Sequence, residues 1–468
     1  MRDPGTVDPA PLQDALPGER LELVTRTALR RRVRMTDGAV DSVGDATTTT
    51  TMVRSVADGS VGCATTSGLS ATAVAEAVRV ARRLRAPGVL APADDRTPPA
   101  RDPAAERAAQ QAWERVVSCG TAESIARLRE LSARVHGVRR AQATWDQVAQ
   151  FVTLADSAGR VVSYRHPEVT LALTVVAAGR TGRSTGTGGR TAAGPDGLDA
   201  AGIAAEAVAE AAGRMPSATR PEGAPPRRLD AVIAPRAASR LLAQIAAVFY
   251  GDRADLDRAG AYAPGSRVLA DGVGLVDDAG APSGLGTVPC DDEGTLTART
   301  VLVDDGRAGA LLHDRSSPSP GSRSSGNGWM VPFGSGVGSG IAVAGTLLAL
   351  RGPVRPLTDL LGGSGPVLYV TRIDDGSGRA LDAAHDSVRM ALSGWLVRDG
   401  APYLPVAGVS VGMRLRDFLA RIEGTSDVRE DYRVAAGSTL RKGPAVHSTH
   451  ISLRDLPVTF QEDSWQRQ

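Results

Sequence analysis

The chain is poor in aromatic residues and in cysteine. Aromatic side chains make up only 3% of its 468 residues, so we expect a core built from Val, Leu, Ile and Ala. The three cysteines, Cys63, Cys119 and Cys290, are odd in number and lie far apart. Disulfide frameworks and zinc ribbons need paired cysteines at short spacings. The cysteine pattern therefore argues against both kinds of structure.

Long apolar segments are also missing. No hydrophobic run approaches the roughly 20 residues that a helix needs to cross a bilayer. The start of the chain, MRDPGTVDPAPLQDALPGE, is polar and rich in proline, and it has no apolar core of a signal peptide. We therefore expect a cytoplasmic protein that does not contact a membrane.

Lysine and asparagine are almost absent, and each occurs once, as Lys442 and Asn327. Of the 54 basic residues, 53 are therefore arginine (54 − 1), a bias that we attribute to a GC-rich genome. The 52 acidic residues are spread along the chain and leave a formal net charge of +2. Nucleic-acid-binding domains concentrate positive charge on one face. We therefore expect no nucleic-acid partner.

The length of the chain is sufficient for two or three domains. The clearest boundary is Pro216–Arg228, where proline, glycine and charge replace periodic hydrophobicity. We predict a disordered N-terminus at residues 1–18, an N-terminal domain at 19–220 and a C-terminal domain at 229–468. The predicted fold class is α+β. Antiparallel strands and helices form a sandwich-like N-terminal domain, and the C-terminal domain is mainly β, with a curled sheet or barrel.

Four Asp-Gly pairs stand between β-prone runs, a pattern typical of hairpin turns. These pairs begin at Asp37, Asp58, Asp305 and Asp399. Apolar residues at helical spacing instead predict helices. The predicted helices span 67–86, 104–117, 121–135, 198–214, 237–249 and 413–422. Residues 179–197 are rich in Gly, Thr, Arg and Ser, and we predict a loop there that packs into no core.

The stretch from Pro289 to Gly340 is the most informative part of the sequence. Two β-prone runs surround the Asp305-Gly306 turn, and a polar loop rich in glycine and serine follows at Ser316–Gly328. Long irregular loops inside compact domains are usually functional or mobile. Backbone amides of such a loop can bind an extended peptide at a sheet edge. A surface loop without a ligand is the equally weighted alternative.

Three further groups of polar residues are weaker candidates. His447 and His450 have a metal-like spacing, but their β-prone context places them on opposite faces of a strand. His313 and Asp314 are consecutive, so their side chains point apart, which disfavours a catalytic triad. A group of acids lacks the spacing of a calcium loop, and turn chemistry accounts for most of it. This group is Asp291, Asp292, Glu293, Asp304 and Asp305.

Four short motifs follow one another in the middle of the chain: DDEG at 291–294, VLVDDG at 301–306, LLHDR at 311–315 and SGNG at 325–328. In this order they resemble the TldD/PmbA family, which contains the paired TldD and TldE (PmbA) subunits of a zinc-dependent peptidase. The resemblance covers nearly the whole chain. It implies two subunits that share one fold and pack together around an enclosed chamber.

The resemblance also indicates which of the two subunits this chain is. In the catalytic subunit, a helix early in the second domain carries LLHEAVGH, and a late cysteine completes the zinc site. A catalytic zinc takes about three protein ligands and a water. Here the corresponding segment is LLAQIAAV, with Ala243 and Val248 at the histidine positions and Gln244 at the glutamate position. No cysteine follows Val434, so the chain resembles the TldE type, without a catalytic residue or a metal ligand.

The resemblance leads us to predict a non-catalytic, TldE-like subunit of a heteromeric zinc metallopeptidase that hydrolyses peptides. Zinc is expected in a TldD-like partner subunit, in a heterodimer or a higher assembly. Maturation of a peptide-derived natural product is one specialised use that we consider. Two alternatives stay open: a peptide-binding or scaffold protein without peptidase activity, and an independent enzyme with another nucleophile. The predicted substrate-binding residues are His313, Ser324, Ser325, Gly326, Asn327 and Gly328.

Overall fold

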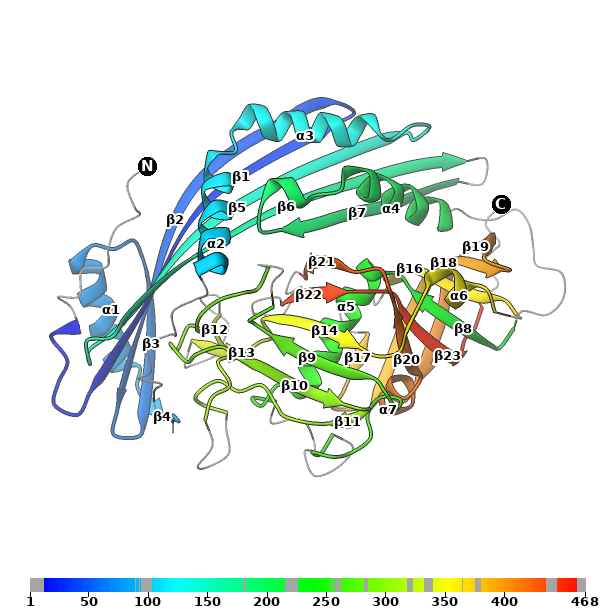
Figure 1. Cartoon of the computed structure of the whole chain (residues 1–468). Coiled ribbons are helices and arrows are strands. Elements are labelled where there is room, and N and C mark those ends of the chain that lie inside the picture. Colours follow the sequence, from blue (N-terminus) through cyan, green and yellow to red (C-terminus); the bar gives the residue numbers. More distant parts are fainter. Residues whose placement is uncertain are drawn as a thin grey trace.

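A long curved sheet arches over a second, strand-rich part of the chain (Figure 1). This computed structural model describes residues 12–88, 90, 91, 93, 103–179, 182–214, 226–253, 256, 262–281, 285–317, 323–331, 340–363, 365–374, 380–434 and 444–460. The fold is α+β with mainly antiparallel strands, as predicted. In the second part the described strands form open sheets and no closed barrel. None of the described helices is long and apolar enough to span a membrane.

The curved sheet has seven strands in the order β4-β3-β2-β1-β5-β6-β7. Their bounds are β1 Arg20–Thr36, β2 Ala39–Ala57, β3 Ser60–Ser67, β4 Ala86–Pro87, β5 Arg140–Asp156, β6 Val161–Gly179 and β7 Gly182–Ala192. Side chains alternate between the two faces of a strand. On β1, Leu21 and Val33 therefore point to one face, where helices cover them, whereas Val24 joins the core of the second part.

Helices pack on the outer face of the curved sheet. They are α1 Ala71–Arg83, α2 Pro103–Ser118, α3 Thr121–Ala133 and α4 Ala200–Gly213, with a 3-10 turn, η2, at Pro195–Gly197. The hydroxyl of Ser70 caps α1 as predicted, because it accepts a hydrogen bond of 3.2 Å from the Ala73 amide. Leu128 and Leu131 of α3 pack with Trp145 of β5, so one apolar layer joins helices and strands.

The four predicted Asp-Gly turns are confirmed. Both residues of each pair have positive φ, at 50° and 82° for Asp37-Gly38 and at 50° and 75° for Asp399-Gly400. The turns at Asp58 and Asp305 have the same geometry. Two-residue hairpins need positive φ at both central positions, which aspartate tolerates and glycine adopts at no cost. These turns set the register of the strands on either side.

The prediction of an unpacked loop at residues 179–197 is wrong. Residues Gly182–Ala192 form β7, which pairs with β6 along its whole length, and α4 lies on top of it. The glycines make this contact possible, because a Cβ at Gly186 would lie 2.0 Å from the Ala207 carbonyl oxygen. A Cβ at Gly188 would lie 2.1 Å from the Ile203 carbonyl oxygen. A composition typical of loops here serves close packing of a helix on a strand.

The second part of the chain contains a six-stranded sheet, an eight-stranded sheet and a two-stranded ribbon. The six-stranded sheet has the order β11-β10-β9-β14-β22-β21, and the eight-stranded sheet runs β15-β20-β23-β8-β16-β18-β17, with β19 paired to β18. The strands up to β15 are β8 Arg228–Ile233, β9 Gly274–Asp278, β10 Arg299–Asp304, β11 Arg307–Ala308, β12 Gly328–Met330, β13 Ile341–Val343, β14 Leu347–Arg351 and β15 Val354–Arg355. The remaining strands are β16 Val367–Asp374, β17 Leu381–Asp382, β18 Ser387–Arg398, β19 Ala401–Met413, β20 Ile422–Ser426, β21 Glu430–Arg433, β22 Ala445–Ser448 and β23 Ile451–Pro457.

Three helices in the described residues accompany these sheets: α5 Pro235–Ala246, α6 Leu357–Leu361 and α7 Leu415–Leu419, with a 3-10 turn, η3, at Ala247–Phe249. The helix predicted at 413–422 is thus shorter than expected. The largest hydrophobic cluster surrounds α5 and also contains Val24, Met52 and Leu154 of the curved sheet. The curved sheet and the second part therefore share one apolar contact region.

The predicted disorder at residues 1–18 concerns mostly residues 1–11, which lie outside the described residues. Residues from Leu12 onwards are placed, and Leu12 is only 3% exposed against Leu21 and Val74. Glu19 then forms ion pairs with Arg82 and Arg85. The segment from Leu12 to Glu19 is therefore packed against α1.

We predict that limited trypsin digestion cuts within Pro216–Arg228 before it cuts β7. The first segment has the Pro/Gly-rich composition of a domain boundary, and it contains Arg227 as a trypsin site, whereas the Arg220-Pro221 bond resists trypsin. Arg190 in β7 offers the matched internal site, but its backbone is paired with Leu171 of β6. Mass spectrometry of the first fragments distinguishes these sites. Early cleavage after Arg190 with an intact 216–228 segment would contradict the proposed boundary.

Candidate functional site

Helix α5 carries most of LLAQIAAV, the segment in which the sequence predicts that zinc ligands are missing. Its apolar residues recur at helical spacing, and Ala238, Leu241, Leu242 and Ile245 are all at most 1% exposed. Pro235 stands in its first turn, where the missing amide hydrogen costs nothing. The helix follows β8 directly and lies among β14, β16 and β22. The sheets therefore hold α5 firmly in the core.

The three residues at the expected ligand positions do not fit a zinc ion. Ala243 offers no donor atom, and the Val248 side chain is apolar and 2% exposed. Val248 also lies beyond the end of α5, in η3. Gln244 accepts a hydrogen bond of 3.1 Å from the Leu381 amide, so its carbonyl oxygen already has a partner. Among the described residues, no three His, Cys, Asp or Glu side chains come together as a metal site.

The DDEG segment, residues 291–294, lies buried between the curved sheet and the second part of the chain. Asp291 is fully buried, and its Oδ1 accepts hydrogen bonds from the Glu293 and Thr295 amides at 3.0 and 2.9 Å. Its Oδ2 accepts a bond of 2.8 Å from the Gly328 amide, at the start of β12. Asp291 therefore shapes its own turn and also anchors β12, so turn chemistry alone does not account for it.

Asp292 and Glu293 connect the DDEG segment to the curved sheet. The Asp292 carboxylate accepts two hydrogen bonds from Arg26 of β1, at 2.9 and 3.0 Å, and one of 2.7 Å from the Met330 amide. Glu293 accepts a bond of 2.5 Å from Arg54 of β2, a side chain 2% exposed. Paired hydrogen bonds between guanidinium and carboxylate give both attraction and orientation. The segment is thus held to two neighbouring strands at once.

Arg54 is the centre of this ionic network. It also donates to the Glu22 carboxylate at 2.7 Å, and Glu22 pairs in turn with Arg315. Burial alone raises the pKa of Glu22, but Arg54 and Arg315 outweigh it and lower this pKa from 4.5 to about 2. Ionised Glu22 therefore stabilises the fold fully above about pH 4.5, and this contribution is lost as the pH falls towards 2.

The carboxyl groups of Asp291 and Glu293 have raised pKa values, in contrast to that of Glu22. Burial raises the pKa of Asp291 well above its usual value, and the neighbouring Glu293 adds to this effect. Burial likewise raises the pKa of Glu293, although Arg54 partly offsets it. Several carboxyl groups are thus packed closely around few guanidinium groups. The network depends on each arginine keeping its position.

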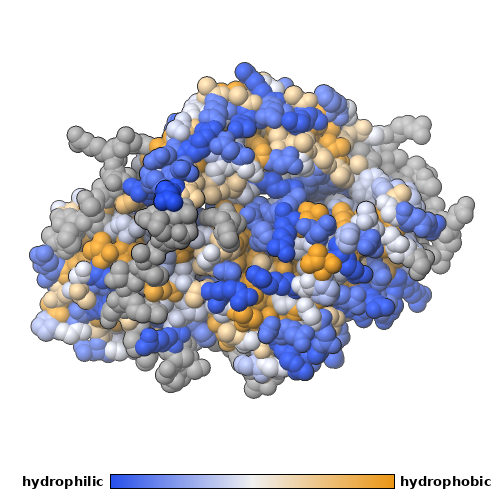
Figure 2. Space-filling view, viewed as in Figure 1, coloured by the Kyte–Doolittle hydropathy of each residue, from blue (hydrophilic) through white to orange (hydrophobic). Residues whose placement is uncertain are grey.

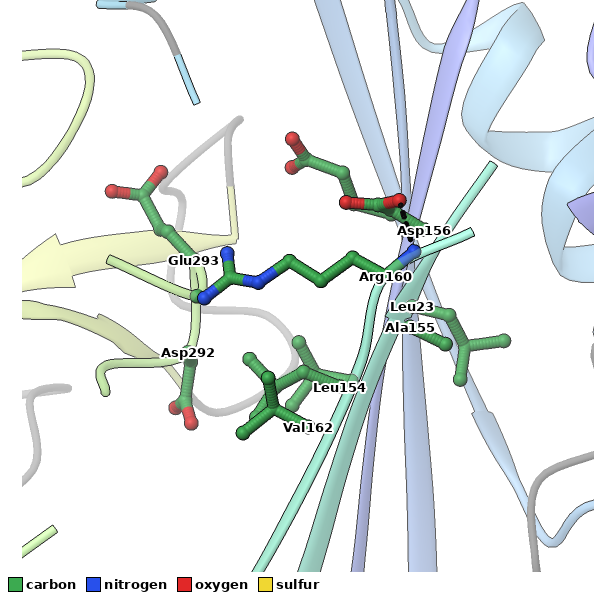
Figure 3. A pocket seen from close by; sticks show the side chains of 11 residues that line it. Leu23, Leu154, Ala155, Asp156, Arg160, Val162, Asp292 and Glu293 are labelled. Carbon is green, nitrogen blue, oxygen red and sulfur yellow. Dashed lines mark hydrogen bonds between the residues drawn. The ribbon is translucent and has the colours of Figure 1, made fainter. Parts of the chain in front are cut away.

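A small cavity of about 20 Å³ lies beside this network. In Figure 3 the Arg160 side chain extends from the β5–β6 hairpin towards Asp292 and Glu293. Gly294 has a φ of 76°, and a Cβ there would lie 2.7 Å from an Arg160 guanidinium nitrogen. The cavity has room for about one water molecule. It is therefore a junction between the two parts of the chain and not a substrate pocket.

The six predicted substrate-binding residues do come together in space. Ser324 donates a hydrogen bond of 2.9 Å to the His313 carbonyl oxygen, and Ser325 accepts one of 2.7 Å from the His313 amide. His313, Ser324 and Ser325 are half-buried, whereas residues 326–328 are buried. Residues 318–322 of the predicted loop lie outside the described residues. The geometry therefore separates an accessible part of the predicted site from a buried part.

Asn327 belongs to the buried part of the predicted site. The side chain is 2% exposed, and its nitrogen donates to Asp277 Oδ2 at 2.7 Å and to the Ala344 carbonyl oxygen at 3.1 Å. Its oxygen accepts a bond of 2.7 Å from Ser325. The side-chain amide of Asn327 is thus hydrogen-bonded inside the protein. Asn327 supports the loop from below.

The two histidines of the H-x-x-H pattern have separate partners. His447 lies on β22, and its Nδ1 is 2.6 Å from Asp431 Oδ1. His450 is buried, its Nδ1 lies 2.8 Å from Ser426 Oγ, and burial lowers its pKa to about 4. The rings therefore take part in two different polar groups. The side chains of His313 and Asp314 also have separate partners. His313 Nδ1 lies 3.3 Å from Ser317 Oγ, whereas Asp314 accepts a hydrogen bond from the Ser316 hydroxyl.

Solved structures with the same fold span almost the entire chain. A Bacteroides thetaiotaomicron protein described as a modulator of DNA gyrase has a TM-score of 0.76 at 14% identity and covers 97% of this chain and 98% of its own. A Thermotoga maritima protein with a similar description has a TM-score of 0.73 at 16% identity, covering 95% and 96%. TldE from Thermococcus kodakarensis has a TM-score of 0.72 at 16% identity, covering 94% and 96%. These likenesses show the fold.

Family models assign the sequence itself. The PmbA/TldA metallopeptidase domain 1 matches residues 26–85, the central domain matches 99–215 and the C-terminal domain matches 226–453. None of the curated proteins matches the sequence. The fold and the three consecutive matches define a metallopeptidase-like protein. The chain belongs to the PmbA/TldD family.

We predict that Arg54→Met lowers the free energy of unfolding by about 3–5 kcal/mol, because it leaves Glu22 and Glu293 buried without their shared partner. Arg79→Met is the matched control, since the Arg79 side chain is 63% exposed and pairs with Glu76 of the same helix, α1. That change should cost at most about 1 kcal/mol. Urea denaturation followed by circular dichroism measures both. Equal losses in the two variants would show that the network is not a main stabilising contact.

We predict that Asn327→Ala acts on stability, with a loss of about 1–3 kcal/mol, since buried hydrogen-bond partners are left unsatisfied. Asn327→Asp should cost more, because it places a second carboxylate against Asp277. Thermal unfolding of both variants tests this order. If both variants unfold like the original chain and only peptide handling changes, Asn327 contacts substrate as first expected.

Proposed function

We propose that this chain is the TldE-like subunit of a heteromeric zinc metallopeptidase and that a TldD-like partner carries the zinc. The observation that carries this proposal is the chemistry of the side chains at the motif positions of α5 and η3. At the positions where the catalytic subunit has ligands and a base, Ala243 and Val248 offer no donor atom and Gln244 is hydrogen-bonded to Leu381. No step of zinc chemistry is therefore assigned to this chain.

The proposal gives this chain a structural share in peptide hydrolysis. The likeness to TldE from Thermococcus kodakarensis over nearly both full chains supports it. A subunit with the same fold as its partner can pack against it and help to enclose the reaction chamber. The proposed assembly is cytoplasmic, and its substrate is a peptide. Maturation of a peptide-derived natural product is one use within this proposal.

We propose that the accessible part of the predicted loop faces this chamber. His313, Ser324 and Ser325 are half-buried, so their polar groups are within reach of a ligand. Asn327 and Asp291 hold the base of the loop through Ser325 and the Gly328 amide. A peptide strand bound here forms hydrogen bonds with a loop that buried contacts already hold in place. The buried residues thus keep the loop in position and the accessible ones meet the peptide.

We predict that peptide hydrolysis appears only when this chain is mixed with a TldD-like subunit. Alone, the purified chain should retain no stoichiometric zinc after dialysis against a mild chelator, whereas the complex should hold zinc on the partner. Elemental analysis and a peptide-cleavage assay on the same samples measure both. The control is a complex in which the partner's motif histidines are replaced by alanine, which should assemble but not cleave.

Three results would count against this proposal. About one zinc retained per isolated chain would place a metal site here, and cleavage by the isolated chain at the rate of the mixture would make it an independent enzyme. Peptide binding without any stimulation of a TldD-like subunit would favour a binding or scaffold protein. Size-exclusion chromatography of the mixture separates failure to assemble from failure to cleave.

A further inference from the structure

Two parallel strands separate at their carboxyl ends and open a pocket. β14 and β22 pair from Leu347 opposite Ala445 to Ala349 opposite His447. After this point β14 continues towards β15, which pairs with β20 in the other sheet, and β22 leads to β23 in that same sheet. In open sheets, crevices form where neighbouring strands diverge at their carboxyl ends. Here the gap is a cavity of about 250 Å³.

The residues around this pocket include both cationic and aliphatic side chains. It is lined by Ala349, Leu350, Arg351, Gly352, Val354, Thr425, Arg429, His447 and Thr449. No aspartate or glutamate among the described residues lines it. Asp431 lies nearby, but it is bound to His447 Nδ1 at 2.6 Å. The cationic groups are therefore not neutralised within the pocket itself.

Arg351 and Arg429 differ from the arginines at the junction between the two parts of the chain. Other arginines, such as Arg54 and Arg26, pair with carboxylates. In the described part of the chain, neither the Arg351 nor the Arg429 side chain has an ion-pair or hydrogen-bond partner, and both residues are exposed. A guanidinium carries five N–H donors in a planar fork that matches the oxygens of carboxylate and phosphate. Two such forks at one cavity are suited to an oxyanion.

The volume of the pocket and its aliphatic lining residues limit the class of ligand that it can bind. A volume of about 250 Å³ corresponds to roughly eight water molecules at ~30 Å³ each, which is more than a bare anion fills. Ala349, Leu350 and Val354 present aliphatic carbon beside the arginines. In a peptide that ends in an aliphatic residue, the C-terminal carboxylate and the apolar side chain are attached to the same Cα atom, so both can enter one pocket.

We propose that this pocket binds an oxyanion-bearing small ligand and that its ligand is the C-terminal carboxylate of a peptide with an aliphatic last residue. Arg351 and Arg429 bind the carboxylate, and the aliphatic side chain lies against Leu350 and Val354. An organic phosphate offers the same oxyanion chemistry from another source. The proposal rests on the pocket alone and does not depend on pairing with a zinc-bearing subunit.

Isothermal titration of the purified full-length chain tests this proposal with three probes. The probes are an N-acetylated Ala-Leu dipeptide with a free carboxylate, the same dipeptide as its C-terminal amide, and inorganic phosphate. We expect the free acid to bind at least about tenfold more tightly than the amide, because charge-assisted hydrogen bonds are lost with the carboxylate. Binding should weaken with added salt, since the arginines are exposed.

Substitutions assign the binding to the pocket. Arg351→Gln combined with Arg429→Gln should weaken binding of the free acid at least about tenfold. Arg389→Gln is the control, because Arg389 is an exposed arginine of β18 that does not line the pocket. Equal affinity for acid and amide, equal affinity of the double variant and the original chain, or no binding of any probe would overturn the proposal. Arginine-dependent binding of phosphate alone would overturn the peptide assignment and retain an oxyanion site.

Discussion

The buried guanidinium of Arg54 is the contact on which the arrangement of the whole chain depends. It binds Glu22 within the curved sheet and Glu293 in the DDEG segment, so one side chain joins the two parts of the molecule. Removing ions from water is costly, and a buried charge is tolerated only where its partners are in place. The network therefore allows one placement of the curved sheet over the second part. The apolar contacts of Val24, Met52 and Leu154 reinforce this placement.

The same junction connects the fold to the proposed site. Asp292 binds both Arg26 of the curved sheet and the Met330 amide, and its neighbour Asp291 binds the Gly328 amide, so the DDEG segment holds both the curved sheet and β12. Asn327 immediately precedes β12 and is secured by Asp277. The half-buried His313, Ser324 and Ser325 therefore rest on a base ordered by long-range contacts. Helix α5 and η3, by contrast, have only Ala243, Val248 and the hydrogen-bonded Gln244 at the positions where a catalytic subunit needs ligands and a base.

Local patterns in the sequence were informative wherever structure depends on a few neighbouring residues. The Asp-Gly pairs at Asp37 and Asp399 predicted hairpins, because the conformation they need is a property of the two residues themselves. The prediction failed at Gly182–Ala192, where a loop-like composition forms β7. The glycines there are used for contact with α4, residues Ala200–Gly213, and that contact cannot be recognised from composition.

The sequence by itself determined the strand and helix periods, the Asp-Gly turns, the family and the absence of zinc-binding side chains in LLAQIAAV. Only the tertiary structure decided that Asn327 is buried, that Asp292 and Glu293 bind arginines, and that Arg351 and Arg429 meet at one pocket. The physical reason is separation along the chain. Arg54 and Glu293 are 239 residues apart, so their ion pair has no local signal. A charge next to a turn looks the same in sequence whether water or a distant arginine becomes its partner.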